Sequence, residues 1–354
     1  MKLIFLLSGD YIELGAEEVI SLLNVKSYIL RDRLMIFDLD NETLLPAISK
    51  KLALSKNIYK CLFECKINDL KEKMKSFCWN SVYKDNFCLR VNHFGGNDKK
   101  PNKNQKEFSE KNLAGHIWRS IKNPNVDLEN PKTEIHVFIF KNTAYCGLLI
   151  KKLGYDFDSR KSHLRPFPHP SSLHPKVARA LVNISEVKDN ETMLDPFCGT
   201  GGFMIEAGLM NIKTVGYDID KTMIEGCRDN LKNFKIQKFK IFHKNALRIS
   251  DKFDYAVTDL PYGLNSNAVS SYGKNWKKHR INSKIDKKSF TRNLENFYLK
   301  FLKSMRKKLR KKAVIVFPSY VDYKKLLRQS KFRIEFEFEI YVHRSLSRMI
   351  VKAS

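Results

Sequence analysis

The sequence predicts an α/β protein whose C-terminal half is a parallel sheet with an antiparallel hairpin at its end, preceded by smaller α/β domains. From Ser171 onward, short apolar runs alternate with helical patterns, which is typical of a sheet covered by helices on both faces. Between Ile334 and Ile340 apolar residues alternate with glutamates, which predicts an antiparallel strand. The segment before Ser171 contains no repeats and no Gly/Ser linker.

Length and charge limit the possible functions. The chain has 354 residues, enough for two or three domains, with 65 Lys and Arg against 38 Asp and Glu, a net charge of +27. Such a charge attracts phosphate backbones, although a Lys- and Asn-rich composition can also reflect genome base bias. Because the apolar runs are too short for a membrane span or a signal peptide, and seven cysteines suit reduced thiols, we expect a cytoplasmic protein.

The N-terminal part reads as two small α/β units. Apolar runs predict strands at Leu3–Leu7, Ser27–Leu30, Leu34–Leu39, Phe87–Val91, Ile135–Phe140 and Tyr145–Ile150. Helical spacing predicts helices at Glu13–Leu23, Glu42–Leu54 and Leu113–Ile121. The proline-interrupted stretch that follows suits an extended connector, so we expect domains at 1–60 and 61–152, a linker at 153–170 and a last domain at 171–354.

The last domain shows the alternation most clearly. Pro175 suits the first position of a helix, and apolar residues from Leu294 to Leu309 follow a helical period. The segment Arg348–Lys352 lies close enough to the Ile334–Ile340 strand to pair with it as a hairpin. Strands are predicted at Thr192–Leu194, Thr214–Tyr217, Phe239–Phe242, Tyr255–Thr258 and Ala313–Phe317.

A glycine-rich loop, Asp195–Gly202, follows the first of these strands and opens a helix. In such sheets ligands bind outside the carboxyl ends of the strands. Met204 occupies the third glycine position of a dinucleotide-binding fingerprint, and no P-loop occurs. Both observations argue against a site that binds nucleotide phosphates. Asp218, at the next strand tip, can accept hydrogen bonds from ribose hydroxyls, and Asn245 can bond an adenine edge; each alone can equally be a strand cap. Together they predict an adenosine ligand without pyrophosphate, S-adenosylmethionine.

A second loop follows the fourth strand and reads Asp259-Leu260-Pro261-Tyr262. An exocyclic base amine is a poor nucleophile until hydrogen-bond acceptors turn its lone pair toward a methyl donor. The Asp259 carboxylate and the Leu260 carbonyl can serve as acceptors, Pro261 stiffens the turn and Tyr262 can stack on a base. An ordinary turn with a buried tyrosine is the alternative, which the preceding glycine loop and Asp218 make less attractive.

The motifs D-P-F-C-G-T-G-G and D-L-P-Y-G resemble those of Rossmann-fold methyltransferases acting on nucleobase amines. More narrowly, Arg165–Lys176, Val126–Pro131 and Val342–Arg348 are similar to segments of the archaeal tRNA (guanine-N2)-dimethyltransferases named for guanosine 10. The resemblance covers nearly the whole chain. It implies a ferredoxin-like domain at 1–60, a THUMP domain at 61–152 and a Rossmann-fold methyltransferase domain at 171–354.

The resemblance also implies site residues. The catalytic loop would comprise Asp259, Leu260, Pro261 and Tyr262. The S-adenosylmethionine pocket would be formed by Ser172, Leu173, His174, Asp195, Phe197, Gly199, Gly201, Asp218, Ile219, Asn245 and Ala246, with Ser172–His174 at the methionine end. This chain departs from the family pattern in two places: Leu260 replaces a second proline, and Asn245 replaces an acid.

A basic run next to the catalytic loop predicts RNA contact. Lys274–Arg292 holds eight Lys or Arg against one acid, Asp286, with Trp276 among them, and a solvated loop is the alternative. By resemblance, the THUMP domain would hold the acceptor end of tRNA. Candidate phosphate contacts are Lys99, Lys100, Lys103, Lys106, Lys111, Arg119, Lys274, Lys277, Lys278 and Arg280.

The sequence thus predicts a tRNA guanine-N2 methyltransferase, expected to be a monomer, with tRNA as its partner. Neither the histidines nor the cysteines match zinc spacings, so no metal is expected. Alternatives are the same chemistry on another tRNA position or on rRNA, and a tRNA-binding protein without catalysis. Adenine-N6 methylation is a weaker alternative, because the segments similar to those of tRNA methyltransferases indicate a tRNA substrate. A tRNA sulfur enzyme is a further alternative, but the adenylation loop of such enzymes does not occur in this sequence.

Overall fold

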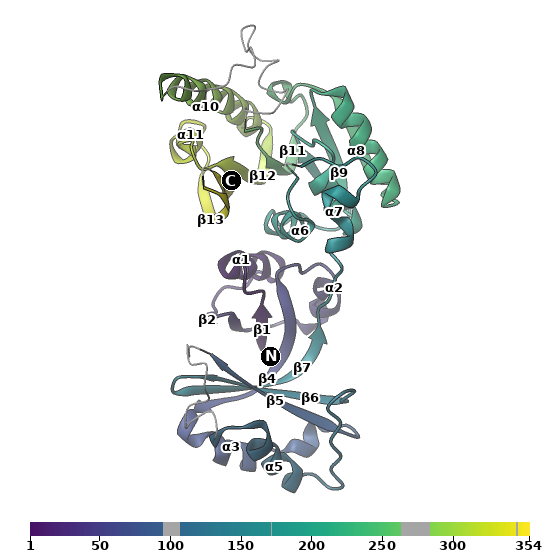
Figure 1. Ribbon diagram of the computed structural model, residues 1–354, viewed down its shortest axis with the longest axis vertical. Helices are drawn as coiled ribbons and strands as arrows, with labels where there is room; N and C mark the ends of the chain where they lie inside the picture. Colours follow the sequence, from purple (N-terminus) through teal and green to yellow (C-terminus); the bar gives the residue numbers. More distant parts are fainter. Residues whose placement is uncertain (95–106, 171, 263–283, 345) are drawn as a thin grey trace. The chain divides into compact units, whose positions relative to one another are not determined.

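The computed structural model describes residues 1–94, 107–170, 172–262, 284–344 and 346–354 (Figure 1). Two compact units divide the chain. The first holds most of Met1–Gly154 and the second holds Tyr155–Ser354 together with the short pieces Glu17–Leu22 and Lys51–Ala53. Within the described residues, no helix is long and apolar enough to cross a membrane.

The first unit contains one seven-stranded sheet, in the order β2-β3-β1-β4-β7-β6-β5. Only β5 and β6 pair in parallel; the other neighbours are antiparallel. Its strands are β1 (Lys2–Leu7), β2 (Ile29–Arg31), β3 (Leu34–Asp38), β4 (Ser55–Lys66), β5 (Phe87–Phe94), β6 (Thr133–Phe140) and β7 (Thr143–Lys152). Its helices are α1 (Ile12–Leu23), α2 (Leu45–Ser49), α3 (Leu70–Ser76) and α5 (Glu110–Ser120).

One prediction for this unit is wrong, and one strand was not predicted. The helix expected at Glu42–Leu54 stops at Ser49, because the chain must then straighten into β4, a strand that the sequence analysis missed. The apolar spacing of β4 is irregular because it pairs with β1 along one part and with β7 along nearly its whole length, with register shifts. A single sheet therefore runs across residue 60, and a domain boundary there stays a prediction.

The second unit contains a sheet in the order β10-β9-β8-β11-β12-β14-β13. The first five strands are parallel, and β14 pairs antiparallel with both β12 and β13. Its strands are β8 (Thr192–Asp195), β9 (Lys213–Asp218), β10 (Phe239–His243), β11 (Phe253–Asp259), β12 (Leu309–Pro318), β13 (Ile334–His343) and β14 (Leu346–Ala353). Its helices are α6 (Pro175–Ile184), α7 (Gly202–Leu209), α8 (Lys221–Asn233), α10 (Lys284–Arg306) and α11 (Tyr323–Gln329).

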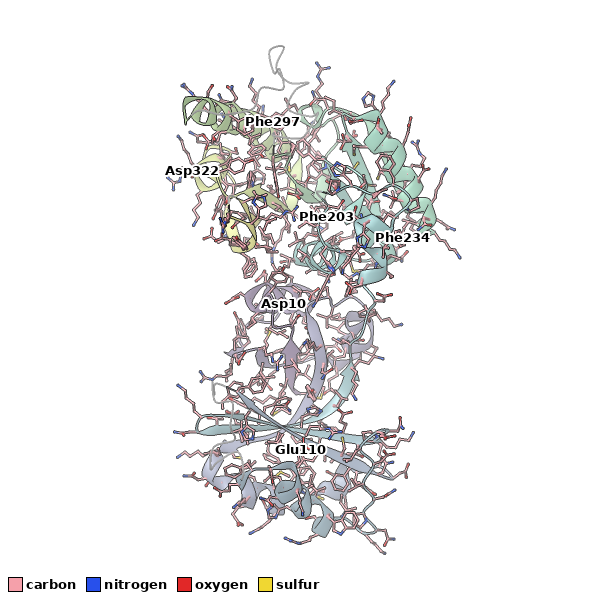
Figure 2. All side chains as sticks on the ribbon, in the orientation of Figure 1. Asp10, Glu110, Phe203, Phe234, Phe297 and Asp322 are labelled. Carbon is pink, nitrogen blue, oxygen red and sulfur yellow. The ribbon has the colours of Figure 1, made fainter. Side chains whose placement is uncertain are left out.

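Helices cover both faces of this sheet, as the alternating pattern predicted (Figure 1). On one face α10 and α11 bury their apolar sides; Phe297, labelled on α10 in Figure 2, is 7% exposed. On the other face α7 and α8 pack a smaller core around Met204 and Leu231. The predicted helix through Leu309 is too long, because Leu309 already starts β12 and pairs with β11. Burial on both faces explains why the parallel strands read as continuous apolar runs.

The strand order reverses between β8 and β11. From β8 the chain proceeds outward to β9 and β10, and it then returns to place β11 on the other side of β8, followed by β12. In open parallel sheets, such a reversal leaves a crevice at the carboxyl ends of the strands. The glycine loop after β8 and the Asp259 loop after β11 both begin at this edge.

Candidate active site

The glycine loop between β8 and α7 depends on two glycines with positive φ. Gly199 has φ 49° and Gly201 has φ 87°, a region that disfavours side chains. A Cβ on Gly201 would lie 2.8 Å from the Cys227 sulfur, so α8 packs directly against the loop. A Cβ on Gly199 would meet no atom within 4 Å. Open space therefore borders the loop at Gly199, and its backbone can be approached closely.

Asp195 supports this loop from inside the protein. Its Oδ1 accepts hydrogen bonds from the Thr258 hydroxyl at 2.9 Å and from the Phe197 N–H at 3.3 Å, so it joins the ends of β8 and β11. The residue is 1% exposed, and this burial raises the pKa of Asp195 to about 7. Phe197, beside it, lies half-buried against α10 residues Phe297 and Phe301.

Asp218 connects the tip of β9 to the glycine loop. One carboxylate oxygen accepts the Gly199 N–H at 2.9 Å and the other accepts the Asp220 N–H at 2.9 Å. Burial raises the pKa of Asp218. A carboxylate oxygen has more than one lone pair, so these bonds leave capacity for a ligand.

The neighbouring strand tip presents Asn245. Its side-chain oxygen accepts the Leu247 N–H at 2.8 Å and thereby starts a short 3-10 helix, Ala246–Arg248. Ala246 is 2% exposed, whereas Ile219, after β9, is half-buried. The tips of β8, β9 and β10 therefore place the predicted pocket residues along one edge of the sheet.

Ser172, Leu173 and His174 approach the glycine loop from the start of α6. The Ser172 hydroxyl lies 3.4 Å from the Thr200 hydroxyl. His174 caps α6, since its Nδ1 accepts the Lys176 N–H, while its Nε2 lies 3.1 Å from Asp158. Leu173 is buried. Pro175 stands in the first turn of the helix as predicted.

The segment before α6 packs behind the same loop. Asn230 of α8, 0% exposed, exchanges two hydrogen bonds with the backbone of Phe167 and donates a third to the Thr200 carbonyl. The fully buried Glu206 of α7 accepts hydrogen bonds from Arg160 and Arg179. The predicted linker is therefore anchored to the second unit, and the sequence analysis gave no role to Asn230 or Glu206.

The predicted catalytic loop begins where β11 ends. The Tyr262 hydroxyl donates a 2.7 Å hydrogen bond to Oδ1 of Asp259. Oδ2 of Asp259 lies 3.8 Å from Nε of Arg348, and 22% of the Asp259 side chain is exposed. Removal of the carboxyl from water raises the pKa of Asp259 to about 6. The Arg348 charge and the Tyr262 hydrogen bond oppose that rise. At neutral pH the group is therefore mainly a carboxylate.

Three backbone contacts hold this loop in place. Leu260 is 1% exposed, and its N–H donates to the Val316 carbonyl of β12 at 3.1 Å. The Tyr298 hydroxyl donates to the Pro261 carbonyl at 2.8 Å, and the Tyr320 hydroxyl donates to the Tyr262 carbonyl at 2.6 Å. The sequence analysis missed both tyrosines, because no local pattern links them to residues 37 and 58 positions away.

The predicted RNA-binding residues are described only in part. Arg119 is exposed at the end of α5 in the first unit, beside Trp118, which is 48% exposed. Lys111 is also exposed on α5. The remaining candidates lie outside the described residues: Lys99, Lys100, Lys103, Lys106, Lys274, Lys277, Lys278 and Arg280.

Comparison with known proteins agrees with this fold. A family model for an RMKL-like methyltransferase domain matches residues 162–277, and one for the THUMP domain matches residues 64–149. The crystal structure of TrmN from Thermus thermophilus superposes with a TM-score of 0.53 at 15% identity, covering 100% of this chain and 99% of that chain. The protein is thus a Rossmann-fold methyltransferase that carries a THUMP domain.

Two curated relatives narrow the assignment. A tRNA (guanine(10)-N2)-dimethyltransferase from Methanothermobacter thermautotrophicus is 30% identical over 311 residues, which cover 86% of this chain and 83% of the relative. The protein of the same name from Pyrococcus abyssi is 28% identical, covering 80% of this chain and 78% of the relative. The chain belongs to the tRNA (guanine(10)-N2)-dimethyltransferase family.

Proposed function

We propose that this enzyme transfers a methyl group from S-adenosylmethionine to the exocyclic N2 of guanosine 10 in tRNA. One observation carries the proposal: Asp259 and the Leu260 carbonyl stand at the tip of β11, beside the open glycine loop at the tip of β8. The pairing of β11 with β8 supports the proposal, because it brings these two hydrogen-bond acceptors next to the loop expected to hold the adenosine. The names of the relatives supply the base and its position.

The residues present fit S-adenosylmethionine. The open space at Gly199 admits a ligand against the backbone, and Asp218 lies directly behind that loop. The loop lacks the third glycine of the dinucleotide-binding fingerprint, since Met204 stands there and is buried. The cofactor would be held by the glycine loop, Asp218 and the Asn245 turn, and it would supply an electrophilic methyl group.

The chain's own residues would orient the base. The Asp259 carboxylate and the Leu260 carbonyl accept the two N–H bonds of the guanine amine, which turns the nitrogen lone pair toward the methyl carbon. Within the described residues, no donor contacts the Leu260 carbonyl, whereas the next two carbonyls are occupied by tyrosine hydroxyls. As the N–C bond forms and the C–S bond breaks, one amine proton leaves for Asp259 or for solvent.

The base must leave the RNA stem to reach Asp259. Flipping a nucleotide out of a stem costs about a few kcal/mol, which phosphate contacts and stacking can offset. The charge of +27 favours such contacts, and the THUMP domain provides a second surface for tRNA. We propose that the two domains together select guanosine 10.

A transcript assay tests the proposal. Unmodified tRNA is incubated with protein and S-adenosylmethionine, and the nucleosides are analysed by mass spectrometry after RNase mapping. We expect N2-methylguanosine or its dimethyl form at position 10, and none with a transcript that carries adenosine there. Methylation at another guanosine would contradict the position, and methylated adenosine would contradict the chemistry.

Two variants separate catalysis from binding. Asp259→Ala should abolish product while the protein still binds cofactor and tRNA. Asp251→Ala removes an exposed carboxylate from the same unit and should leave the rate unchanged. Unaltered methylation by Asp259→Ala would refute the mechanism.

We also propose that the protein acts as a monomer in the cytoplasm. All seven cysteines are free thiols, which suits a reducing compartment. Light scattering of the purified protein tests the monomer, and a mass of twice 41.4 kDa would contradict it.

A further inference from the structure

Arg348 reaches the catalytic loop from the last strand of the chain. Because β14 runs antiparallel to β12, its first residues lie at the edge where the parallel strands end. Arg348 pairs with Pro318, two positions beyond Val316, and Val316 is the β12 partner of Asp259. Because β14 runs in the opposite direction to the parallel strands, its residue Arg348 lies at their carboxyl ends.

The Arg348 side chain contacts both polar groups of the loop. Its Nε donates a 3.0 Å hydrogen bond to the Tyr262 hydroxyl and lies 3.8 Å from Oδ2 of Asp259. The guanidinium carbon lies 5.8 Å from the centroid of the Tyr262 ring. Only 14% of the Arg348 side chain is exposed, so bulk water screens the charge weakly.

We propose that Arg348 is a positioning residue for methyl transfer: it retains the Tyr262 hydroxyl and keeps Asp259 ionised while the carboxylate exchanges Tyr262 for the amine of the base. This inference rests on the proposed function. It assigns Arg348 a role through Asp259 and Tyr262, with no contact to the reacting atoms.

The exchange follows from the hydrogen bonds. In this structure the Tyr262 hydroxyl occupies Oδ1 of Asp259, one of the oxygens that the base would use. When the amine displaces that hydroxyl, the Tyr262 O–H loses the acceptor of its hydrogen bond, which is unfavourable. The bond that Nε of Arg348 donates to the Tyr262 oxygen remains, so that oxygen keeps a partner and the ring keeps its orientation.

The charges around Asp259 make Arg348 important for its ionisation. Burial favours the neutral acid, and Asp195 on β8 is a second carboxyl close enough to interact with it. Tyr298 on α10 and Tyr262 on the loop face the same carboxyl as neutral hydroxyl groups. Arg348 is the cation acting on Asp259 among the described residues. An opposite charge at this range lowers a carboxyl pKa by about 1–3 units.

The pH dependence of kcat tests the proposal. Rates are measured from pH 5 to 9 at saturating tRNA and cofactor, so that titration of Asp195 in cofactor binding does not enter. For the native protein we expect an acidic limb near pH 6, the pKa of Asp259. Arg348→Gln should move that limb upward by roughly 1–3 pH units and lower the plateau.

Arg348→Lys distinguishes charge from geometry. A lysine keeps the charge but loses the fork of donors, so the limb should stay near pH 6 while the plateau still falls. Arg333→Gln, which removes an equal charge from a side chain that is 80% exposed near the same hairpin, should change neither. If Arg348→Gln binds cofactor normally and keeps the native limb and plateau, the proposal is overturned.

A double variant tests the route through Tyr262. If Arg348 acts by holding the tyrosine hydroxyl, Arg348→Gln should reduce the plateau less in a Tyr262→Phe background than in the native background. Equal reductions in both backgrounds would contradict this part of the proposal.

A direct titration separates this inference from the proposed function. If the native protein methylates no tRNA, the proposed function fails, and the Asp259 carboxyl can still be titrated by ¹³C NMR, assigned with Asp259→Asn. A higher midpoint in Arg348→Gln than in the native protein supports the role of Arg348 in ionisation. Identical midpoints refute it, and Arg348→Lys provides this comparison if the glutamine variant fails to fold.

Discussion

Two acids at the carboxyl edge of the sheet, the buried Asp195 and the partly exposed Asp259, carry raised pKa values, about 7 and about 6. An unfolded aspartate titrates near ~3.9. Between pH 4 and 7 the folded protein therefore holds protons that the unfolded chain has lost, so its free energy of unfolding falls as the pH rises through this window. The site retains groups that cost stability, which is common where a carboxylate serves binding or catalysis.

Asp259→Asn should therefore stabilise the fold while it stops methyl transfer. The amide carries no charge to bury, so we expect the free energy of unfolding at pH 8 to rise by about 1–3 kcal/mol. Thermal melting monitored by circular dichroism measures the change. The gain should grow from pH 4 to about 6 and level off above; a gain that is independent of pH would show that ionisation is not its cause.

Asn230 supports the site through backbone groups. It satisfies the N–H and carbonyl of Phe167 and the carbonyl of Thr200, and all three bonds are lost in Asn230→Leu. Because buried polar groups without partners are costly, we expect a loss of about 2–4 kcal/mol in stability. Cofactor affinity, measured by calorimetry, should also fall.

The matched control for Asn230 is the exposed Asn233 in the last turn of the same helix. Asn233→Leu makes the same substitution and should change melting temperature and cofactor affinity little. Equal effects of the two variants would contradict a specific role for Asn230.

At the scale of elements, four separate segments hold the Asp259 loop. β12 binds the Leu260 N–H, α10 supplies Tyr298, the turn after β12 supplies Tyr320 and β14 supplies Arg348. The family pattern has a second proline where this chain has Leu260. Here the leucine side chain is buried in the core under α10, so packing provides the stiffness that a proline ring would otherwise supply.

Removing the two tyrosine hydroxyls should loosen this loop without touching the cofactor. For Tyr298→Phe and Tyr320→Phe we expect kcat to fall by about tenfold each, because a misplaced acceptor weakens orientation, while cofactor affinity stays the same. Single-turnover methylation and calorimetry measure these quantities. Tyr341→Phe removes a hydroxyl from a residue that is 68% exposed and serves as control; native kcat in both loop variants would show that the hydroxyls do not position the loop.

At the scale of the whole molecule, we expect the charge of +27 to favour association with RNA. Each phosphate contact made by a lysine or arginine releases counterions, so affinity falls steeply with salt. The two units have separate sheets and separate apolar cores, and a basic run follows the catalytic loop in the sequence.

Neutralising Lys277, Lys278 and Arg280 together should weaken tRNA binding and flatten its salt dependence. If all three contact phosphates, the slope of log K against log salt should decrease by roughly 2–3. Filter binding across a series of salt concentrations measures the slope. The control triple variant Lys213, Lys232 and Lys240→Gln removes the same charge from exposed positions of β9, α8 and β10 and should affect the slope less; equal slopes for the two triples would exclude a local contact.

The sequence by itself determined the strands of the second unit, its antiparallel hairpin and the order of Asp195, Asp218 and Asp259 along the chain. These features can be predicted because each depends on a few neighbouring residues. The apolar alternation, the glycine loop and the polar residue after each strand are all local patterns. It failed at Glu42–Leu54 and at β4, where pairing with distant strands overrides local spacing.

Only the tertiary structure decided which side chains support the site. Tyr298, Tyr320 and Arg348 contact the Asp259 loop from 37 to 86 residues away, and Asn230 contacts Phe167 from 63 residues away. These partnerships depend on which strands are neighbours, in what register and in which direction. Periodicity along a chain carries no record of those choices, because they arise when the faces of the sheet are buried together.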